Sequence, residues 1–196
     1  IKNNNKYQFF IYIYIKKINM NKYPKYEPNK WNKNPYILFS HNCYAYALNL
    51  IDNKIINKCK KKIKNIKKKE GDICGRYKPQ PGLYFYKKIK RRKNINYEKR
   101  ILKDNPYIKK IKSNTKLNKK YYKIALFVTK DKYYHFYRQD NNKLWSHKPG
   151  WDKVTNLDNN KKKIKNPLKC DRGKHKKIIT IYKVPIDNKL KYMKTF

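Results

Sequence analysis

The stretch 133–150 (YYHFYRQDNNKLWSHKPG) constrains the fold most, because it reads as a β-hairpin that carries two of the chain's four histidines. Aromatic, strand-favouring residues dominate 133–137, and Asp140-Asn141-Asn142 forms a turn cluster. Leu144-Trp145 then resumes a second strand. The pattern therefore predicts two antiparallel strands joined by a short polar loop.

The number of residues in this loop decides whether His135 and His147 lie on the same face of the hairpin. A three-residue loop at 140–142, with Asn142 in the left-handed conformation, places His135 directly opposite His147. Cross-strand neighbours on one face lie roughly 5 Å apart at Cβ, close enough for one ring to orient the other. A two-residue turn at the two asparagines would place them on opposite faces. The pairing therefore requires a loop with an odd number of residues.

A second informative stretch runs from Asn42 to Leu48 (NCYAYAL), where Ser40 or Asn42 can cap a helix. Asp52-Asn53 can divide the helical stretch in two. Cys43 then falls in the first helical turn, where free backbone N–H groups and the helix dipole stabilise a thiolate. Cys43 could equally be a small buried hydrophobic residue. Apolar residues continue at helical spacings of three and four as Leu48, Ile51, Ile55, Cys59, Ile63 and Ile66.

The order of these residues resembles the papain-like fold, and more closely its NlpC branch of cell-wall endopeptidases and amidases. In that branch the nucleophile opens a helix just after an acidic or amide residue, here Asn42-Cys43. A proline-glycine turn enters a hydrophobic strand, here 81–86 (PGLYFY). The base opens a hairpin whose return strand carries a polar orienting residue, here His135 and His147. The chain is also similar to uncharacterised bacterial and large-DNA-virus proteins of this kind.

The resemblance implies an α+β fold in which a helix bearing the cysteine packs on an antiparallel sheet. It implies Cys43 as nucleophile, His135 as base and His147 as orienting residue, with a peptide or amide substrate and no cofactor or metal. Attack of the thiolate of a thiolate–imidazolium pair on an amide carbonyl would give a thioester that water hydrolyses, or that another nucleophile accepts. His41 is a rival base. Asp152, Asn156 and Asp158 are further candidates for the orienting residue.

Net charge suggests a function of another class. The chain has 54 Lys and Arg against 12 Asp and Glu, a formal charge of +42. Such a field attracts nucleic acids and other polyanions. Base-reading surfaces favour arginine, but only six of these residues are Arg. Lys, Asn, Ile and Tyr are all abundant, as an AT-rich genome would produce. Two non-catalytic functions therefore stay open: a basic nucleic-acid-binding or packaging protein, and a degenerate papain-like binding module.

The length suits a single domain at 21–196, preceded by an uncertain extension at 1–20 that either adds a strand or precedes a start at Met20. Residues 21–41 contain three prolines, which predicts an extended, loop-rich segment before the helix that begins near Cys43. The basic stretch 87–120 reads as an insertion with a short helix near 97–102 and then a loop. Further strands are predicted at 83–86, 124–129 and 178–184.

The cysteines show neither a C-x-x-C pair nor zinc-ligand spacing, although Cys170 and His175 could share a metal. Cys59 lies on the apolar stripe and is expected to be buried. No disulfide is required, which favours a reducing compartment or a virion. Neither a signal peptide nor a membrane-spanning run is recognisable.

Overall fold

A computed structural model describes residues 23–64, 70–86, 95–131, 133–187 and 191–193. The helices are α2 (Pro28–Asn32), α3 (Pro35–Ser40), α4 (Cys43–Ala47), α5 (Asn53–Lys64), α6 (Glu70–Cys74), the 3₁₀ helix η1 (Gly75–Tyr77), α7 (Leu83–Tyr86) and α8 (Tyr97–Asp104). The strands are β1 (Lys109–Ile111), β2 (Tyr121–Val128), β3 (Tyr134–Gln139), β4 (Trp145–His147) and β5 (Lys177–Pro185). The predicted extension at 1–20 lies outside the described residues.

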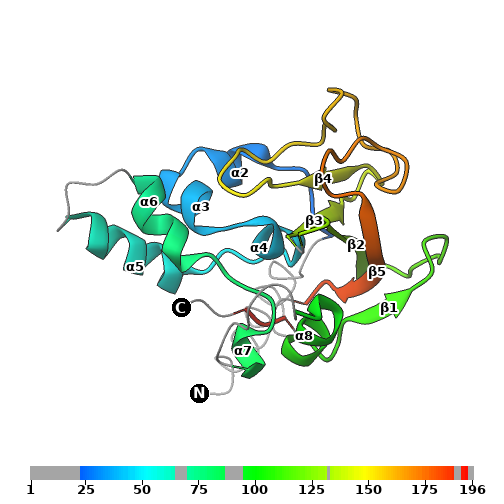
Figure 1. Cartoon of the computed structure of the whole chain (residues 1–196), viewed down its shortest axis with the longest axis horizontal. Helices are drawn as coiled ribbons and strands as arrows, with labels where there is room; N and C mark the ends of the chain where they lie inside the picture. Colours follow the sequence, from blue (N-terminus) through cyan, green and yellow to red (C-terminus); the bar gives the residue numbers. More distant parts are fainter. Residues whose placement is uncertain (1–22, 65–69, 87–94, 132, 188–190, 194–196) are drawn as a thin grey trace, which may run out of the picture.

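The architecture is mixed helix and antiparallel sheet, which confirms the predicted α+β class. Figure 1 shows α2, α3, α5 and α6 on one side of the molecule and the sheet on the other, with α4 between them. The strands form one sheet in the order β1-β5-β2-β3-β4, with every pair antiparallel. Its two longest strands, β2 and β5, confirm the strands predicted at 124–129 and 178–184.

The helix α4 packs on β3 and buries a core of aromatic and aliphatic side chains. Tyr44 and Phe136, one from each element, lie with ring centres 5.5 Å apart. Leu126 of β2, which pairs with Phe136, is fully buried in the same cluster. The continuous apolar run of β2 is therefore explained by burial on both faces of a central strand.

The helix boundaries near Cys43 follow the sequence closely. Asn42 caps α4, since its side-chain oxygen accepts hydrogen bonds from the backbone N–H groups of Tyr44 and Ala45. The predicted break at Asp52-Asn53 is also confirmed, because α4 ends at Ala47 and α5 begins at Asn53. Cys43 is thus the first residue of a helix, as the pattern predicts.

The hairpin register differs from the predicted one. Tyr137 pairs with His147 and Gln139 pairs with Trp145, which leaves a five-residue loop at 140–144. Lys143, rather than Asn142, takes the left-handed conformation, with φ 67°. Backbone pairing continues beyond the strand ends, since the Asp140 N–H donates to the Leu144 carbonyl (2.9 Å) and the Lys143 N–H donates to the Asp140 carbonyl (3.0 Å). Five is still an odd number, so the two histidines remain on one face, one diagonal step apart.

The strand predicted at 83–86 is wrong, because these residues form the helix α7. The carboxylate of Asp104 accepts hydrogen bonds from the N–H groups of Gly82 (2.6 Å) and Phe85 (2.9 Å), which favours a helical turn. Gly82 has φ +87°, and a Cβ there would lie 2.3 Å from Arg100 Nε. Glycine is therefore required at this close approach, and the chain turns into a helix instead of a strand.

Two further predictions need correction. The prolines of 21–41 favour an extended segment, yet Pro28 and Pro35 each begin a helix, a position where the missing N–H costs nothing. In the predicted insertion at 87–120, α8 confirms the short helix, but 109–111 forms an edge strand on β5 instead of a loop. Residues 87–94 of that insertion lie outside the described part of the chain.

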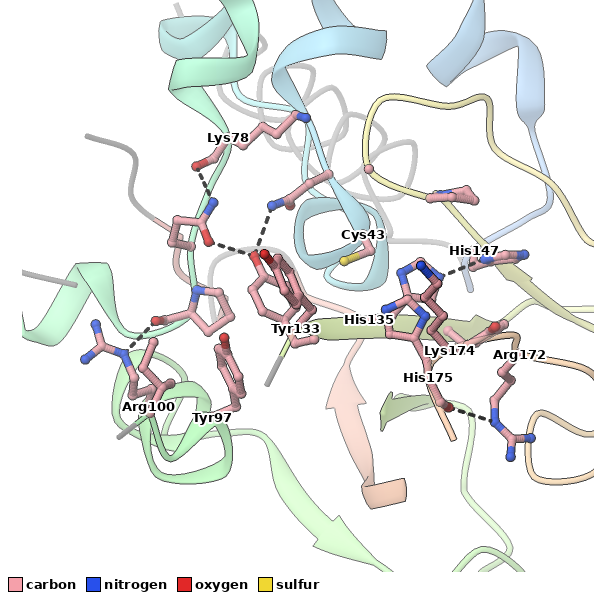
Figure 2. A pocket seen from close by; sticks show the side chains of 18 of the residues that line it. Cys43, Lys78, Tyr97, Arg100, Tyr133, His135, His147, Arg172, Lys174 and His175 are labelled. Carbon is pink, nitrogen blue, oxygen red and sulfur yellow. Dashed lines mark hydrogen bonds between the residues drawn. The ribbon is translucent and has the colours of Figure 1, made fainter. Parts of the chain in front are cut away.

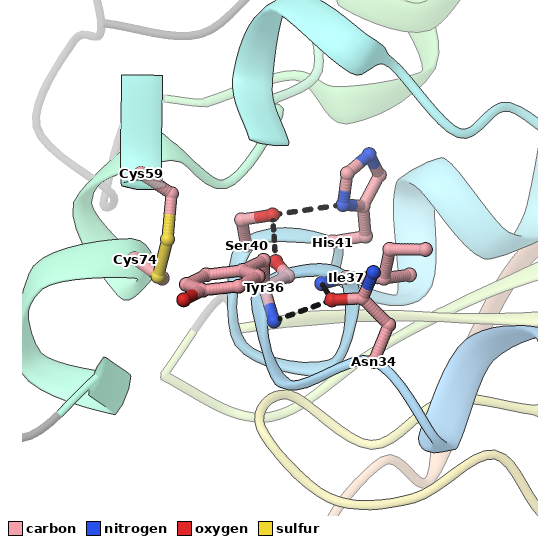
Figure 3. Close-up of a disulfide and its surroundings, with 7 residues drawn as sticks. All are labelled: Asn34, Tyr36, Ile37, Ser40, His41, Cys59 and Cys74. Carbon is pink, nitrogen blue, oxygen red and sulfur yellow. Dashed lines mark hydrogen bonds between the residues drawn. A yellow bond between two sulfur atoms is a disulfide. The ribbon is translucent and has the colours of Figure 1, made fainter. Parts of the chain in front are cut away.

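A disulfide joins Cys59 of α5 to Cys74 of α6, with Cα atoms 5.0 Å apart (Figure 3). Cys59 is buried as expected, but it is bonded rather than free. The spacing of the cysteines did not predict this pairing. Within the described residues, every helix is too short or too polar to cross a bilayer.

Candidate functional site

The three residues predicted to act together line one cavity of about 720 Å³ (Figure 2). Cys43 comes from the first turn of α4, His135 from the beginning of β3 and His147 from the end of β4. All three side chains are largely buried, at 5%, 5% and 7% exposure. The fold thus brings Cys43 and His147, which lie 104 positions apart in the sequence, to one cavity.

The side chain of Asn42 ties the helix α4 to the cavity wall. Besides capping α4, its amide nitrogen donates to the carbonyl of Pro79 (2.7 Å) and to the Tyr134 hydroxyl (3.2 Å). The Tyr134 hydroxyl in turn donates to the side-chain oxygen of Gln80 (2.9 Å). Because the cap occupies the next two helical N–H groups, the N–H of Cys43 itself is left without an acceptor among the residues described.

A chain of hydrogen bonds sets the tautomers of the two histidines. Nε2 of His147 lies 3.0 Å from the carbonyl oxygen of Leu157, which can only accept, so this nitrogen carries the proton. Nδ1 of a neutral His147 therefore has a free lone pair, and it lies 2.8 Å from Nε2 of His135. His135 consequently donates from Nε2, and its own lone pair is on Nδ1. The Leu157 carbonyl thus fixes the tautomers of both neutral rings, and the basic nitrogen of His135 is Nδ1.

This chain predicts how His147 can be replaced. His147→Leu removes the acceptor for His135 Nε2–H, so we expect the rate of Cys43 alkylation by iodoacetamide at pH 7 to fall by up to about 10⁴-fold, the loss found when the orienting residue of a catalytic triad is removed. His147→Asn offers an amide oxygen in its place and should retain much of the rate. An unchanged rate in His147→Leu would contradict the orienting role.

Burial controls the charge states of the pair. It raises the pKa of the Cys43 thiol to about 11, although the backbone N–H groups of Phe136 and Tyr44 and the amines of Lys148 and Lys78 act in the opposite direction. Burial, with the added effect of the neighbouring His147 and His175, holds the pKa of His135 well below 6.5. At neutral pH Cys43 is therefore a thiol and His135 a neutral imidazole, and both line the same cavity.

Two lysines shape the electrostatics near Cys43. Lys148 is fully buried, and its amine donates to the carbonyls of Leu38 (2.7 Å), Gly150 (3.1 Å) and Asp152 (3.2 Å). Burial lowers the pKa of Lys148 to about 7 and that of Lys78 to about 8. The Lys78 amine lies 4.3 Å from the ring centre of Trp151. Their positive charge favours any thiolate formed on Cys43.

The rival base lies elsewhere. Nε2 of His41 accepts a hydrogen bond from the N–H of Asp52 (3.0 Å), and its Nδ1 lies 2.9 Å from the Ser40 hydroxyl. His41 is absent from the cavity lining, and burial lowers its pKa to about 4. These hydrogen bonds link the end of α3 to Asp52, the residue before α5.

The group that holds His147 is a backbone carbonyl. Leu157 supplies it, whereas the side chains of Asp152, Asn156 and Asp158 make no such contact with the ring. The metal site considered for Cys170 and His175 gains no support from the described residues. Cys170 is a free, half-buried thiol, and no group of three or more potential metal ligands occurs among the described residues.

Sequence reasoning missed several residues that line the cavity, among them Lys78, Tyr134 and His175. Tyr134 could have been suggested by its place beside His135 on the same strand. Lys78 and His175 come from irregular segments that carry no periodic signal, so the sequence alone offered no way to place them at the site.

Comparisons with known proteins give one partial similarity. Neither a family model nor a solved structure matches the chain. The insoluble matrix shell protein 1 of Ruditapes philippinarum is 48% identical over 50 residues, which are 26% of this chain and 34% of that protein. The chain thus matches about a third of the length of this relative.

Proposed function

We propose that the chain is a papain-like, cysteine-dependent amide hydrolase in which Cys43 is the nucleophile and His135 the base. The observation that carries the proposal is the hydrogen-bond chain from the Leu157 carbonyl through His147 to His135, which leaves the His135 lone pair on Nδ1 in the cavity that Cys43 lines.

The neutral resting pair is compatible with catalysis. When an amide carbonyl reaches Cys43, Nδ1 of His135 takes the thiol proton as the sulfur attacks, so the buried site gains no net charge. The N–H of Cys43 can donate to the oxyanion that forms. His135 then returns the proton to the departing amine, and water attacks the thioester to release the acid and restore the thiol.

The fold is compatible with the papain-like resemblance at a coarse level. A short helix that begins with the cysteine packs on an antiparallel sheet, and the base and its orienting residue follow on neighbouring strands. The helix at 83–86, where the resemblance implies a strand, is a departure that alters the cavity wall near Pro81.

Trapping of an acyl-enzyme tests the proposal without a known substrate. We expect p-nitrophenyl acetate to release a burst of one equivalent of p-nitrophenol and to add one acetyl group to Cys43, seen by intact-mass and peptide mass spectrometry. Cys43→Ala should abolish the burst. Cys170→Ala, which removes the second free thiol, should retain it. Acetylation that follows Cys170, or that spreads over lysines with no burst, would overturn the proposal.

Polyanion binding is the second candidate, supported by the excess of 54 basic over 12 acidic residues. It predicts that affinity for nucleic acid falls steeply with salt and is unaffected by Cys43→Ala, because phosphate contacts release counterions whatever the cavity contains. The two functions are therefore separable with the same variant.

A further inference from the structure

A third histidine lies against the proposed base. The ring centres of His175 and His135 are 5.0 Å apart, with an interplanar angle of 37°. Figure 2 shows His175 beside His135, at the end of the segment that also carries Arg172 and Lys174. His175 lines the same cavity and is partly exposed, whereas His135 is almost completely buried.

The turn that presents His175 is tightly built. The guanidinium of Arg172 donates to the carbonyls of Pro167 (2.6 Å), Cys170 (3.0 Å) and His175 (3.3 Å), and the N–H of His175 donates back to the Arg172 carbonyl (3.1 Å). Gly173 has φ +55°, and a Cβ there would lie 2.4 Å from the side chain of Asn159. Glycine adopts this positive φ without strain, and the hydrogen bonds between Arg172 and His175 hold the turn together.

This turn is also anchored to the strand next to His135. The Arg172 guanidinium lies 4.6 Å from the ring centre of Phe127, and Phe127 is the cross-strand partner of His135. The sheet therefore fixes the turn relative to the base.

The groups around His135 come from four parts of the chain. Tyr137 of the same strand lies edge-on at 5.0 Å, His147 of β4 binds Nε2, and Cys43 of α4 lines the cavity with it. The remaining neighbour, His175, has no part in the proposed reaction. Lys174 and Lys78 also line the cavity, and neither contributes to the charge state of His135 as His175 does.

We propose that His175 is a positioning residue of the Cys43 site, which covers the ring of His135 and keeps that ring in its neutral, basic form. The inference rests on the proposed function, because it assigns His175 an effect on the base of that reaction.

The physical reason is repulsion between like charges. The more exposed His175 takes up a proton first as the pH falls, and a second positive charge on His135 then costs energy. Two unit charges 5 Å apart at an effective dielectric constant between about 20 and 80 alter a pKa by roughly 0.5 to 2 units. The pKa of His135 is indeed held down by burial first, then by His147 and His175. Loss of His175 should therefore raise the pKa of His135. The pH below which the alkylation rate of Cys43 falls, the acid limb of its pH profile, should rise with it.

The test compares His175→Phe, which keeps a ring against His135 but removes the charge, with His175→Ala. Histidine titration is followed by NMR on the full chain labelled at imidazole carbons, together with the pH profile of Cys43 alkylation. We expect the midpoint of His135 and the acid limb to rise together, by about 0.5 to 2 units in both variants. The thermal unfolding midpoint of His175→Phe serves as the control for folding. If His175→Ala is unstable, the titration of His135 in His175→Phe decides the test.

A His135 midpoint that stays unchanged in His175→Phe, or that falls, would overturn the inference. These outcomes can be told apart from failure of the proposed function. If Cys43 of the wild-type chain shows no activation, the hydrolase proposal fails, while the titration of His135 still reports whether His175 controls its charge.

Discussion

His135→Ala is expected to change the pH dependence of Cys43 alkylation from a plateau into a tenfold rise per pH unit. In the wild-type chain, the thiol can pass its proton to His135 at any pH between the low pKa of the imidazole and the pKa of about 11 of the buried thiol. The rate with iodoacetamide should therefore stay constant from about pH 6.5 to 9, since His135 has its reference pKa of ~6.5 lowered. Without the imidazole, only the small thiolate fraction reacts.

At pH 7 we expect His135→Ala to lower the Cys43 rate by about 10²–10⁴-fold, the usual contribution of a general base. Cys170 is the internal control, because its alkylation should be the same in both proteins. His41→Gln is the matched control among the histidines, since His41 lies outside the cavity lining. A wild-type profile with the tenfold slope of an isolated thiol would show that Cys43 and His135 do not exchange a proton.

Arg138→Ala is expected to lower the free energy of unfolding by about 3–5 kcal/mol, the usual cost of removing one partner of a buried ion pair. Arg138 and Asp140 are fully buried, with the guanidinium 2.8 Å from the carboxylate. The guanidinium also donates to the carbonyls of Tyr46 (3.2 Å) and Lys25 (2.9 Å). It therefore ties the strand that carries His135 to the helix that carries Cys43. Urea unfolding followed by circular dichroism measures the loss.

The pH dependence of this loss provides the control. Burial raises the pKa of Asp140 despite the opposing effect of Arg138, so folding favours the protonated carboxyl, and stability decreases as the pH rises through that pKa. Removal of Arg138 raises the pKa of Asp140 further, so the variant should lose more stability at pH 8 than at pH 5. The double variant Arg138→Met, Asp140→Leu leaves no unpaired buried charge. Its free energy of unfolding should therefore fall less than that of Arg138→Ala. Equal losses of unfolding free energy in the double variant and in Arg138→Ala would contradict the ion-pair explanation.

Local patterns determined much of the candidate site. Asn42 followed by Cys43 predicted a capped helix that begins at the cysteine, because a short amide side chain satisfies the free N–H groups of a first turn whatever the rest of the fold. The alternating aromatic stretch around His135 predicted a strand, and an odd loop predicted that His147 would share its face. Each of these features depends on residues within a few positions of one another, so they can be recognised in the sequence.

Features that depend on distant partners could not be recognised. Leu83–Tyr86 has a strand-like composition, but the carboxylate of Asp104 makes it a helix. Cys59 meets Cys74 because α5 and α6 pack beside α3. In each case an interaction across the fold outweighed the local preference.

The sequence by itself determined the residue types of the site, the helix that presents Cys43 and the strands that present the two histidines, because caps, turns and alternation are local effects. Only the tertiary structure decided that Leu157 sets the tautomers, that His41 is elsewhere and that the ring of His175 lies against that of His135. These depend on the meeting of irregular segments, whose positions are set by packing and by buried hydrogen bonds rather than by any periodic pattern.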